Sequence, residues 1–468
     1  MVTATTATEN NKLKVGLEIH GYILCAQKLF CNCAITDSEN TQPNTNICPV
    51  CTGQPGSKPM LTNQVALEKA IQIGLMLGCK INPQLMFQRK HYSWPDSPNN
   101  YQRTMSGSYA SPVGENGNFE GIRIRQVHLE EDPAKWDPKT GQIDYNRAGF
   151  PLIEIVTEPD FTDSTQVKEW LQKLVTTLSF IKTLNKTAGI KCDVNVSIGP
   201  KFERVEIKNV NSQTAIVEAI LYEMNRQIGE VTAGKSIPMQ TRAWNDEEKI
   251  TQFMRSKETA EDYMFIPDPD IPYMDISDLY LNSLKEVLPE APSVKKQKLI
   301  KAGLSDEAAN RISIAYTLIN AFETARQLGI SANVAGQFLS RDLIAVVQGK
   351  ELDLDDIVVT QQLYDLLALV DKQQITVQTA QKILKQFPFD EKFNVSEYVK
   401  SQGLIAVADT GALETMCKKA IDANPKAVAD YKAGNENSFN FLIGQVMRES
   451  KGAAKPDILR PIMKKLLD

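Results

Sequence analysis

A change of hydrophobic pattern near Pro289 is the feature that most restricts how this chain can fold. Before it, from about Lys14 to Pro272, short runs rich in Val and Ile alternate with polar residues. After it, strand-like runs disappear, and Ala, Leu, Lys, Gln and Glu dominate. Alternation with a period of two is typical of strands that have one wet face, and the later composition is typical of helices. The chain is therefore predicted to be α+β, with a mainly antiparallel N-terminal sheet domain followed by helices.

The expected elements divide the chain into three domains. At 468 residues the chain is too long for one compact core. We expect a sheet domain over residues 1–290, a helical domain over 291–400 and a smaller helical tail domain over 401–468. Strands are expected at 15–19, 122–127, 152–156, 194–198 and 205–210, and helices at 64–77, 164–184, 214–228 and 437–450.

Charge and composition bound the class of protein. The formal net charge of −5 argues against a protein that coats nucleic acid by bulk electrostatics, although a local basic patch is compatible with it. The segment from Met1 to Lys12 is polar and resembles neither a signal peptide nor a transit leader. No apolar run is long enough for a membrane span. We therefore expect a cytoplasmic protein without a membrane association, and reduced thiols at its eight cysteines.

Four of the cysteines form two close pairs. Cys31 and Cys33 are followed by a spacer and then by Cys48 and Cys51. Such pairs can bring four thiolates together around Zn²⁺, and sites with four cysteines are usually structural because they leave no open position. The alternative is four reduced thiols without a ligand. The remaining cysteines are isolated and are expected to be small core residues.

Polar residues share one face of several predicted strands. Glu18 and His20 flank Ile19, and the other sets that alternate with apolar residues are Asp193 with Asn195, Arg204 with Glu206 and Lys208, and Glu154 between Ile153 and Ile155. An acidic run that includes Glu130 follows His128. The pattern also fits an ordinary wet sheet face. However, a mixture of carboxylate, imidazole, amide and basic groups could hold Mg²⁺ and neutralise charge during phosphoryl transfer.

One short motif is rejected on its context. Residues 229–236 fit the phosphate-loop pattern GxxxxGK[ST]. That loop needs a preceding strand and a following helix, so that the helix N-terminus meets the phosphates. Here a helix is predicted before the motif and extended chain after it. We interpret the segment as a helix-to-strand connection.

Long stretches of the chain resemble the family of B subunits of the tRNA-dependent amidotransferases. The resemblance covers nearly the whole sequence and continues into the tail at 424–428 and 444–447. The matching stretches before the tail are 15–20, 28–33, 47–51, 89–92, 128–132, 144–160, 204–209 and 265–270.

The resemblance implies a sheet similar to the catalytic sheet of glutamine synthetase. It also implies an activity: ATP-dependent phosphorylation of the side-chain carboxylate of Glu-tRNA(Gln) or Asp-tRNA(Asn), followed by displacement of the phosphate by ammonia. The family's Mg²⁺ ligands match His20, Glu130 and Glu154, with Glu18 beside them, and its zinc ligands match the four paired cysteines. Asp193, Asn195, Arg204, Glu206 and Lys208 are then expected to bind ATP.

The resemblance also implies partners. In this family an amidase-type A subunit releases ammonia from glutamine, a small C subunit ties the complex together, and the helical regions bind the mischarged tRNA. This chain has no convincing glutaminase nucleophile of its own, in agreement with that dependence. The basic residues expected to face RNA are Lys418, Lys419, Lys426 and Lys432, although an ordinary solvated helix surface fits them nearly as well.

Two other functions are compatible with parts of the pattern. A tRNA-binding scaffold without catalysis would keep the helical regions but would be expected to lose acidic residues from the sheet face, and these are present. A stand-alone carboxylate–amine ligase acting on small molecules would not need the helical C-terminal third. The sequence does not distinguish Glu-tRNA from Asp-tRNA as the substrate.

Overall fold

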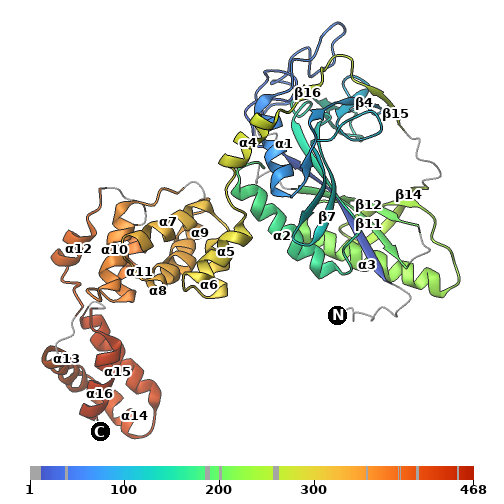
Figure 1. Cartoon of the computed structure of the whole chain (residues 1–468). Helices are drawn as coiled ribbons and strands as arrows, with labels where there is room; N and C mark the ends of the chain where they lie inside the picture. Colours follow the sequence, from blue (N-terminus) through green and yellow to red (C-terminus); the bar gives the residue numbers. More distant parts are fainter. Residues whose placement is uncertain are drawn as a thin grey trace. The chain divides into compact units, whose positions relative to one another are not determined.

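The computed structural model describes residues 12–467 except 37–40, 185–189, 200–202, 257–262, 355–356, 388, 390–391, 407–409 and 451–452. Most of the N-terminal segment predicted to lack a leader, residues 1–11, lies outside this range. The chain divides into two compact units, Met1–Pro289 and Glu290–Asp468 (Figure 1). The first unit carries all the described strands and the second is helical, so the α+β class is confirmed. A further division near residue 400 stays a prediction.

A 12-stranded sheet forms the first unit among the described residues. Ten of its strands form one path in the order β14-β13-β12-β11-β1-β10-β7-β5-β4-β15, and β2 and β6 extend from β7. The pairing is antiparallel as predicted, except that β12 and β13 are parallel. The bounds of the strands are β1 Leu13–Tyr22, β2 Lys80–Ile81, β4 Gln88–His91, β5 Tyr101–Thr104, β6 Gly114–Phe119, β7 Ile122–Glu131, β10 Pro151–Thr157, β11 Ile190–Ile198, β12 Val205–Val210, β13 Gln240–Asn245, β14 Ile250–Ser256 and β15 Met264–Pro267.

Two small two-stranded sheets accompany the large one. In the first, β16 (Met274–Asp275) pairs with β3 (Gln84–Leu85), and in the second, β8 (Lys135–Trp136) pairs with β9 (Ile143–Asp144).

Chain connectivity requires the large sheet to curl. Strands β14 and β15 lie at opposite ends of the ten-strand path, yet only eight residue steps separate Ser256 from Met264. Eight steps of extended chain reach at most about 29 Å. The edges of a flat sheet of ten strands would be about 43 Å apart, because neighbouring strands are about 4.8 Å apart. The sheet is therefore strongly bent. Side chains from strands across it, among them Lys90 of β4, Glu18 of β1 and Arg255 of β14, line one cavity.

The other face of the sheet carries the core. Apolar side chains of β1, β11 and β12 pack with α2 (Ser164–Phe180) and α3 (Gln213–Thr232), which lie against the sheet in Figure 1. Helix α1 (Gln64–Met76) packs on β6 and β7, and α4 (Asp278–Val287) closes the unit. The side chains of Asp163 and Ser212 cap the N-termini of α2 and α3. Burial of one strand face directs the alternate polar residues to the opposite side.

Two helices end four residues away from their predicted ends, whereas the other two predicted helices, α1 and α15, agree with the prediction to within one residue. Helix α2 stops at Phe180, four residues before the predicted end, because Lys182 adopts a positive φ of 53° and Leu184 forms a bridge with Ile23. Helix α3 continues to Thr232 and so contains the first four residues of the phosphate-loop pattern. A helix therefore precedes that pattern and β13 follows it, which confirms the rejection of a phosphate loop.

The second unit is helical throughout its described residues. Ser305 caps α6 as predicted, through a hydrogen bond from the Ala308 amide, and the helix predicted at 437–450 is α15. Part of this unit has its own buried cluster, made by α13, α15 and α16. The bounds are α5 Pro292–Lys301, α6 Asp306–Ile312, α7 Tyr316–Gln327, α8 Ala332–Gln337, the π-helix η1 Phe338–Leu343, α9 Ile344–Gly349, α10 Gln361–Asp371, α11 Val377–Gln386, α12 Val395–Ser401, α13 Thr410–Ala423, α14 Pro425–Lys432, α15 Glu436–Glu449 and α16 Pro456–Leu467.

Candidate functional site

Three adjacent strands bring an imidazole and two carboxylates together. His20 of β1 pairs with Glu154 of β10, and Glu130 of β7 pairs with Leu152, two residues from Glu154 on the same face. One ligand atom from each of His20, Glu130 and Glu154 lies within 4.8 Å of the others. The three residues predicted as a magnesium set are therefore neighbours, although His20 is more than 100 residues from the other two in the sequence. Carboxylate oxygens are the ligands that Mg²⁺ prefers, so the donor set fits such an ion.

The two carboxylates of this set differ in their electrostatic environment. Burial, followed by the charge of Glu154, raises the pKa of Glu130 well above its ordinary value. Burial also opposes ionisation of Glu154, but the hydrogen bond from His128 and the charges of His128, His20 and Lys90 outweigh it and lower the pKa of Glu154. Glu154 therefore ionises more readily than Glu130.

A second acidic group lies beside the first on β1, β11 and β12. Glu18, Asp193 and Glu206 each offer an oxygen within 4.8 Å of the others. Lys208 contacts Asp193, and its Nζ lies 3.1 Å from Glu206 Oε1. Burial, and then the charges of Glu154, Glu206 and Asp193, raise the pKa of Glu18. The amide of Asn195 donates to Glu18 Oε1 at 3.0 Å.

Both acidic groups open into one cavity of about 840 Å³. Basic side chains, Lys90, Arg204, Lys208 and Arg255, line the same space. A cavity of this size with mixed charge can accept a phosphorylated ligand together with a polar co-substrate. The complete lining is Glu18, His20, Lys90, Gln102, Thr104, Ser106, Glu130, Leu152, Glu154, Asp193, Glu203, Arg204, Glu206, Lys208, Pro238, Met239, Arg255 and Tyr263.

Almost all of the sheet residues singled out from the sequence meet at this cavity. The exception is Asn195, which is not part of the lining and reaches the site only through its hydrogen bond to Glu18. Sequence reasoning also missed cavity residues, among them Lys90, Gln102 and Arg255. Lys90 could have been found from the alternation within β4, because Lys90 lines the cavity while its neighbours Arg89 and His91 do not.

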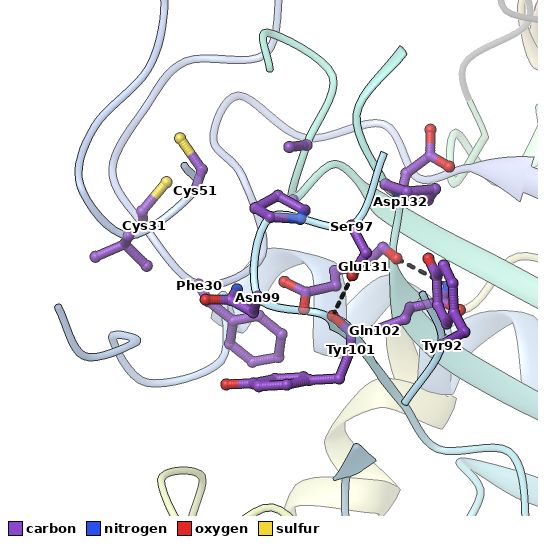
Figure 2. Close-up of a pocket in the computed structure, with 15 residues that line it drawn as sticks. Phe30, Cys31, Cys51, Tyr92, Ser97, Asn99, Tyr101, Gln102, Glu131 and Asp132 are labelled. Atoms are coloured by element: carbon purple, nitrogen blue, oxygen red, sulfur yellow. Dashed lines mark hydrogen bonds between the residues drawn. The ribbon is translucent and has the colours of Figure 1, made fainter. Parts of the chain in front are cut away.

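Gln102 connects this cavity with a smaller one. Its amide nitrogen donates to Glu130 Oε2 at 2.7 Å. It also donates to the Glu131 carbonyl at 3.0 Å, and Gln102 and Glu131 are both drawn in Figure 2. The smaller cavity has room for about one water molecule, at ≈ 20 Å³. Gln102 and Glu131 line it on one side and Cys31 and Cys51 on another, so the cysteine loop packs close behind the acidic site.

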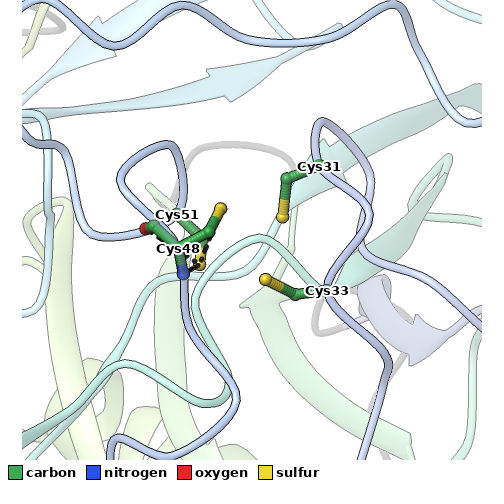
Figure 3. A group of neighbouring side chains, drawn as sticks. All are labelled: Cys31, Cys33, Cys48 and Cys51. Atoms are coloured by element: carbon green, nitrogen blue, oxygen red, sulfur yellow. Dashed lines mark hydrogen bonds between the residues drawn. The ribbon is translucent and has the colours of Figure 1, made fainter.

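The four paired cysteines converge as predicted. Their sulfur atoms all lie within 4.8 Å of one another, and no disulfide links them (Figure 3). The sulfurs of Cys48 and Cys51 are 3.8 Å apart. Tetrahedral Zn²⁺ with Zn–S bonds of about 2.3 Å places its ligand sulfurs about 3.8 Å apart, so the donor set fits a zinc ion.

The cysteines do not ionise alike. The hydrogen bond with the Cys31 thiol, outweighing burial, lowers the pKa of Cys51 to about 4, and Lys28 adds to this effect. Burial raises the pKa of Cys33 to about 11. Of these two sulfurs, that of Cys51 more readily carries a negative charge.

Comparison with known proteins identifies the family. The profile of the GatB/GatE catalytic domain matches residues 13–282, and that of the GatB domain matches residues 320–467. The chain belongs to the GatB family. Three relatives, each named as the B subunit of an aspartyl/glutamyl-tRNA(Asn/Gln) amidotransferase, are 41%, 39% and 38% identical to it, from Methanothermobacter thermautotrophicus, Methanocaldococcus jannaschii and Methanopyrus kandleri. The matches cover 95%, 98% and 97% of this chain and 98%, 99% and 99% of the relatives.

Within this GatB-family chain, both acidic groups and the four cysteines lie in the part matched by the catalytic-domain profile. Among the residues that the structure describes, no helix has the length and apolar character needed to cross a membrane.

Proposed function

We propose that this chain uses ATP to phosphorylate the side-chain carboxylate of Glu or Asp esterified to tRNA, and that ammonia then displaces the phosphate to form the amide. The observation that carries the proposal is the pair of acidic groups, His20–Glu130–Glu154 and Glu18–Asp193–Glu206, facing one cavity lined by basic side chains. Membership of the GatB family, and relatives named as the B subunit of an aspartyl/glutamyl-tRNA amidotransferase, support the same reaction.

The chemistry explains why both charge types are needed. A carboxylate is a poor electrophile, so one of its oxygens must become a leaving group before ammonia can attack. Transfer of the γ-phosphoryl group of ATP forms an acyl phosphate, and ammonia displaces inorganic phosphate from the carbonyl carbon. Mg²⁺, held by His20, Glu130 and Glu154, would supply charge neutralisation for the phosphoryl group. Lys90, Arg204, Lys208 and Arg255 are positioned to bind phosphate oxygens, since they line the same cavity.

The remaining assignments of the proposal follow from the family. Ammonia would come from glutamine through an amidase-type A subunit, with a small C subunit in the complex, and the proposed location is the cytoplasm. The four cysteines would hold a structural Zn²⁺. The tail would contact tRNA, because Lys418, Lys419, Lys426 and Lys432 are all exposed there and could reach an RNA backbone. Lys418 would have to give up its ion pair with Glu414 to do so.

The decisive experiment measures ATP-dependent phosphate and amide formation with added ammonium. The chain is co-purified with its partner subunits and given Glu-tRNA or Asp-tRNA, and wild type is compared with Glu154→Ala. The matched control is Glu158→Gln, because Glu158 is an acidic residue just beyond the same strand and pairs with Arg125 outside the cavity.

Amide formation that requires Mg²⁺ and Glu154 but not Glu158 would support the proposal and identify the amino acid. Tight tRNA binding without turnover on either substrate would overturn it in favour of a tRNA-binding scaffold. Turnover on free glutamate or aspartate would favour a stand-alone ligase instead.

A further inference from the structure

Lys28 is a buried lysine whose amino group points at the cysteine cluster. It lies in the segment after β1, and only 1% of its surface is exposed. Its Nζ is 3.4 Å from Cys51 Sγ and 3.2 Å from the carbonyl oxygen of Tyr145. The same Nζ lies 5.9 Å from the centre of the Phe150 ring. The side chain is therefore enclosed, and its polar end has two hydrogen-bond acceptors.

The charge of Lys28 needs a negative partner. A buried ammonium group is costly unless it is paired with an anion. Among the residues that the structure describes, no carboxylate lies within ion-pair distance of Lys28, whereas such pairs are formed by many other lysines. The Tyr145 carbonyl is neutral. The sulfur of Cys51 is thus the group near Lys28 Nζ that can carry a full negative charge.

The cysteine cluster, with zinc bound, carries an excess of negative charge. Four thiolates around Zn²⁺ carry a net charge of −2, because each ligand must be deprotonated. Cys31 and Cys51 are buried, so water screens this excess charge poorly on their side of the cluster. A hydrogen bond from an ammonium group to a thiolate is charge-assisted and withdraws electron density from the sulfur.

We propose that Lys28 is the internal counter-ion of the four-cysteine site, where it offsets one negative charge at Cys51 and thereby slows metal loss and attack by electrophiles on that sulfur. The inference rests on the zinc assignment made under the proposed function, and it is independent of the amidation reaction.

The backbone around Lys28 supports a role that extends beyond one sulfur. The Lys28 amide donates to the Cys33 carbonyl at 3.0 Å, and the Leu29 amide donates to the Gly149 carbonyl at 2.8 Å. Lys28 therefore touches both cysteine pairs, and its neighbour fixes the loop that leads into β10, which carries Glu154. Through these contacts the counter-ion joins the cysteine cluster to the strand at the acidic site.

The test separates the charge of Lys28 from its hydrogen bonds and its volume. Lys28→Met removes the charge and both hydrogen bonds but keeps a similar volume. Lys28→Gln keeps an N–H donor without the charge, and Lys28→Arg keeps the charge. The control is Lys58→Met, which removes an exposed lysine near the same loop that pairs with Asp270. The full chain is used for every variant.

Three quantities are measured on each chain. Zinc per chain is determined by elemental analysis, zinc release is followed with a chromogenic chelator, and alkylation of Cys51 by N-ethylmaleimide is followed by mass spectrometry. Lys28→Met and Lys28→Gln should release zinc and alkylate Cys51 at least about tenfold faster than wild type, the lower end of the usual effect of losing a partner of a metal ligand. In Lys28→Arg and Lys58→Met, the rates of zinc release and of Cys51 alkylation should stay within about threefold of wild type, since each variant keeps a charged donor at position 28.

The outcomes distinguish this inference from the assignments beneath it. Wild-type chain that binds no zinc would overturn the zinc assignment and the counter-ion with it, while leaving the amidation proposal intact. Zinc-loaded Lys28→Gln with wild-type release and alkylation would overturn the counter-ion alone. If both neutral variants fail to fold while Lys28→Arg folds and holds zinc, the requirement for a positive charge is supported by that contrast. If Lys28→Arg also fails to fold, the positive charge of Lys28 is not what the site requires, and a purely steric role replaces the counter-ion.

Discussion

His128 forms a hydrogen bond with the carboxylate of Glu154 and does not itself line the cavity. His128 Nδ1 lies 2.8 Å from Glu154 Oε2, and the other ring nitrogen lies 3.1 Å from Gln126 Oε1. His128 is buried and stands opposite Glu154 in the register of β7 and β10. Because both ring nitrogens are engaged, the imidazole cannot turn without losing a hydrogen bond. The other carboxylate oxygen, Oε1, lies 3.8 Å from His20 Nε2 within the proposed magnesium set.

We therefore predict that His128 positions Glu154 for metal binding. Replacing His128 with Ala should weaken Mg²⁺-dependent amide formation about 10- to 100-fold, the usual cost of losing a group that orients a metal ligand. His128→Asn, which can place an N–H near the position of Nδ1, should recover part of this loss. The measurements are amide formation as a function of Mg²⁺ concentration and Mn²⁺ binding by electron paramagnetic resonance. An unchanged Mn²⁺ affinity in His128→Ala would refute the positioning role.

A second prediction concerns the lysine inside the other acidic group. Lys208 offsets the repulsion among the carboxylates of Glu18, Asp193 and Glu206. Because Lys208→Met removes this positive charge, the variant should lose about 1–3 kcal/mol of unfolding free energy in the presence of EDTA. Mg²⁺ should restore part of the stability, because a ligand that binds only the folded state stabilises it. Urea unfolding with EDTA and with Mg²⁺ measures both effects.

The control for this prediction is Lys173→Met. Lys173 is an exposed lysine that pairs with Glu120, so its removal should change the urea midpoint little, and equally with and without Mg²⁺. If Mg²⁺ stabilises Lys208→Met no more than it stabilises Lys173→Met, the three carboxylates do not accept a cation when the lysine is absent.

Local patterns predicted which residues face the site, but not which residues they meet. Alternation along 15–20 and 152–156 correctly assigned His20 and Glu154 to the polar face of their strands. Their pairing is set by a strand register between two residues that are 134 positions apart, which depends on the packing of the apolar face against α2 and α3. The family resemblance predicted that His20 and Glu154 lie together, whereas the alternation of polar and apolar residues did not.

Other features depend on tertiary contacts that leave no local signal. The parallel pairing of β12 with β13 follows from the long return through α3, and the early end of α2 follows from the bridge between Ile23 and Leu184. Lys28 resembles any surface lysine in the sequence, and its burial is visible only in the structure. By contrast, the spacing of the four cysteines was enough to predict that they converge.

A third prediction tests a buried ion network on α3. Glu223 is fully buried, and it accepts hydrogen bonds from Arg226 at 2.6 Å, Gln227 at 2.9 Å and Thr251 of β14 at 2.9 Å. Glu223→Gln would leave Arg226 without its buried partner and should cost about 3 kcal/mol of unfolding free energy. Urea unfolding measures the change.

The comparison for Glu223 is Glu230→Gln on the same helix. Glu230 is partly exposed and pairs with the exposed Lys235, so its loss should cost well under about 1 kcal/mol. Equal urea midpoints for the two variants would show that the buried network does not anchor α3 to β14.

The fourth prediction concerns acid stability through Asp270. The hydrogen bond from Lys58, and then the charges of Lys58, Arg89 and Arg103, lower the pKa of Asp270 below its ordinary value of 3.8. Solvent screens Lys58, which is 73% exposed, so most of the stabilisation should come from the 2.6 Å contact with the largely buried Arg89. A carboxyl group whose pKa is lower in the folded state stabilises the fold above its unfolded pKa, and this contribution is lost as the pH falls through the folded pKa.

Asp270→Asn should therefore unfold at lower urea than wild type at pH 7, by about 1 kcal/mol. The difference should persist down to about pH 5 and shrink below about pH 4, as the pH falls toward the lowered pKa of Asp270 in the folded chain. Lys58→Met, measured in parallel, should lose much less unfolding free energy at pH 7, because Asp270 still pairs with Arg89 in that variant. A gap between wild type and Asp270→Asn that stays constant down to about pH 2 would mean that the contribution of Asp270 comes from the shape of its hydrogen bonds and not from its charge.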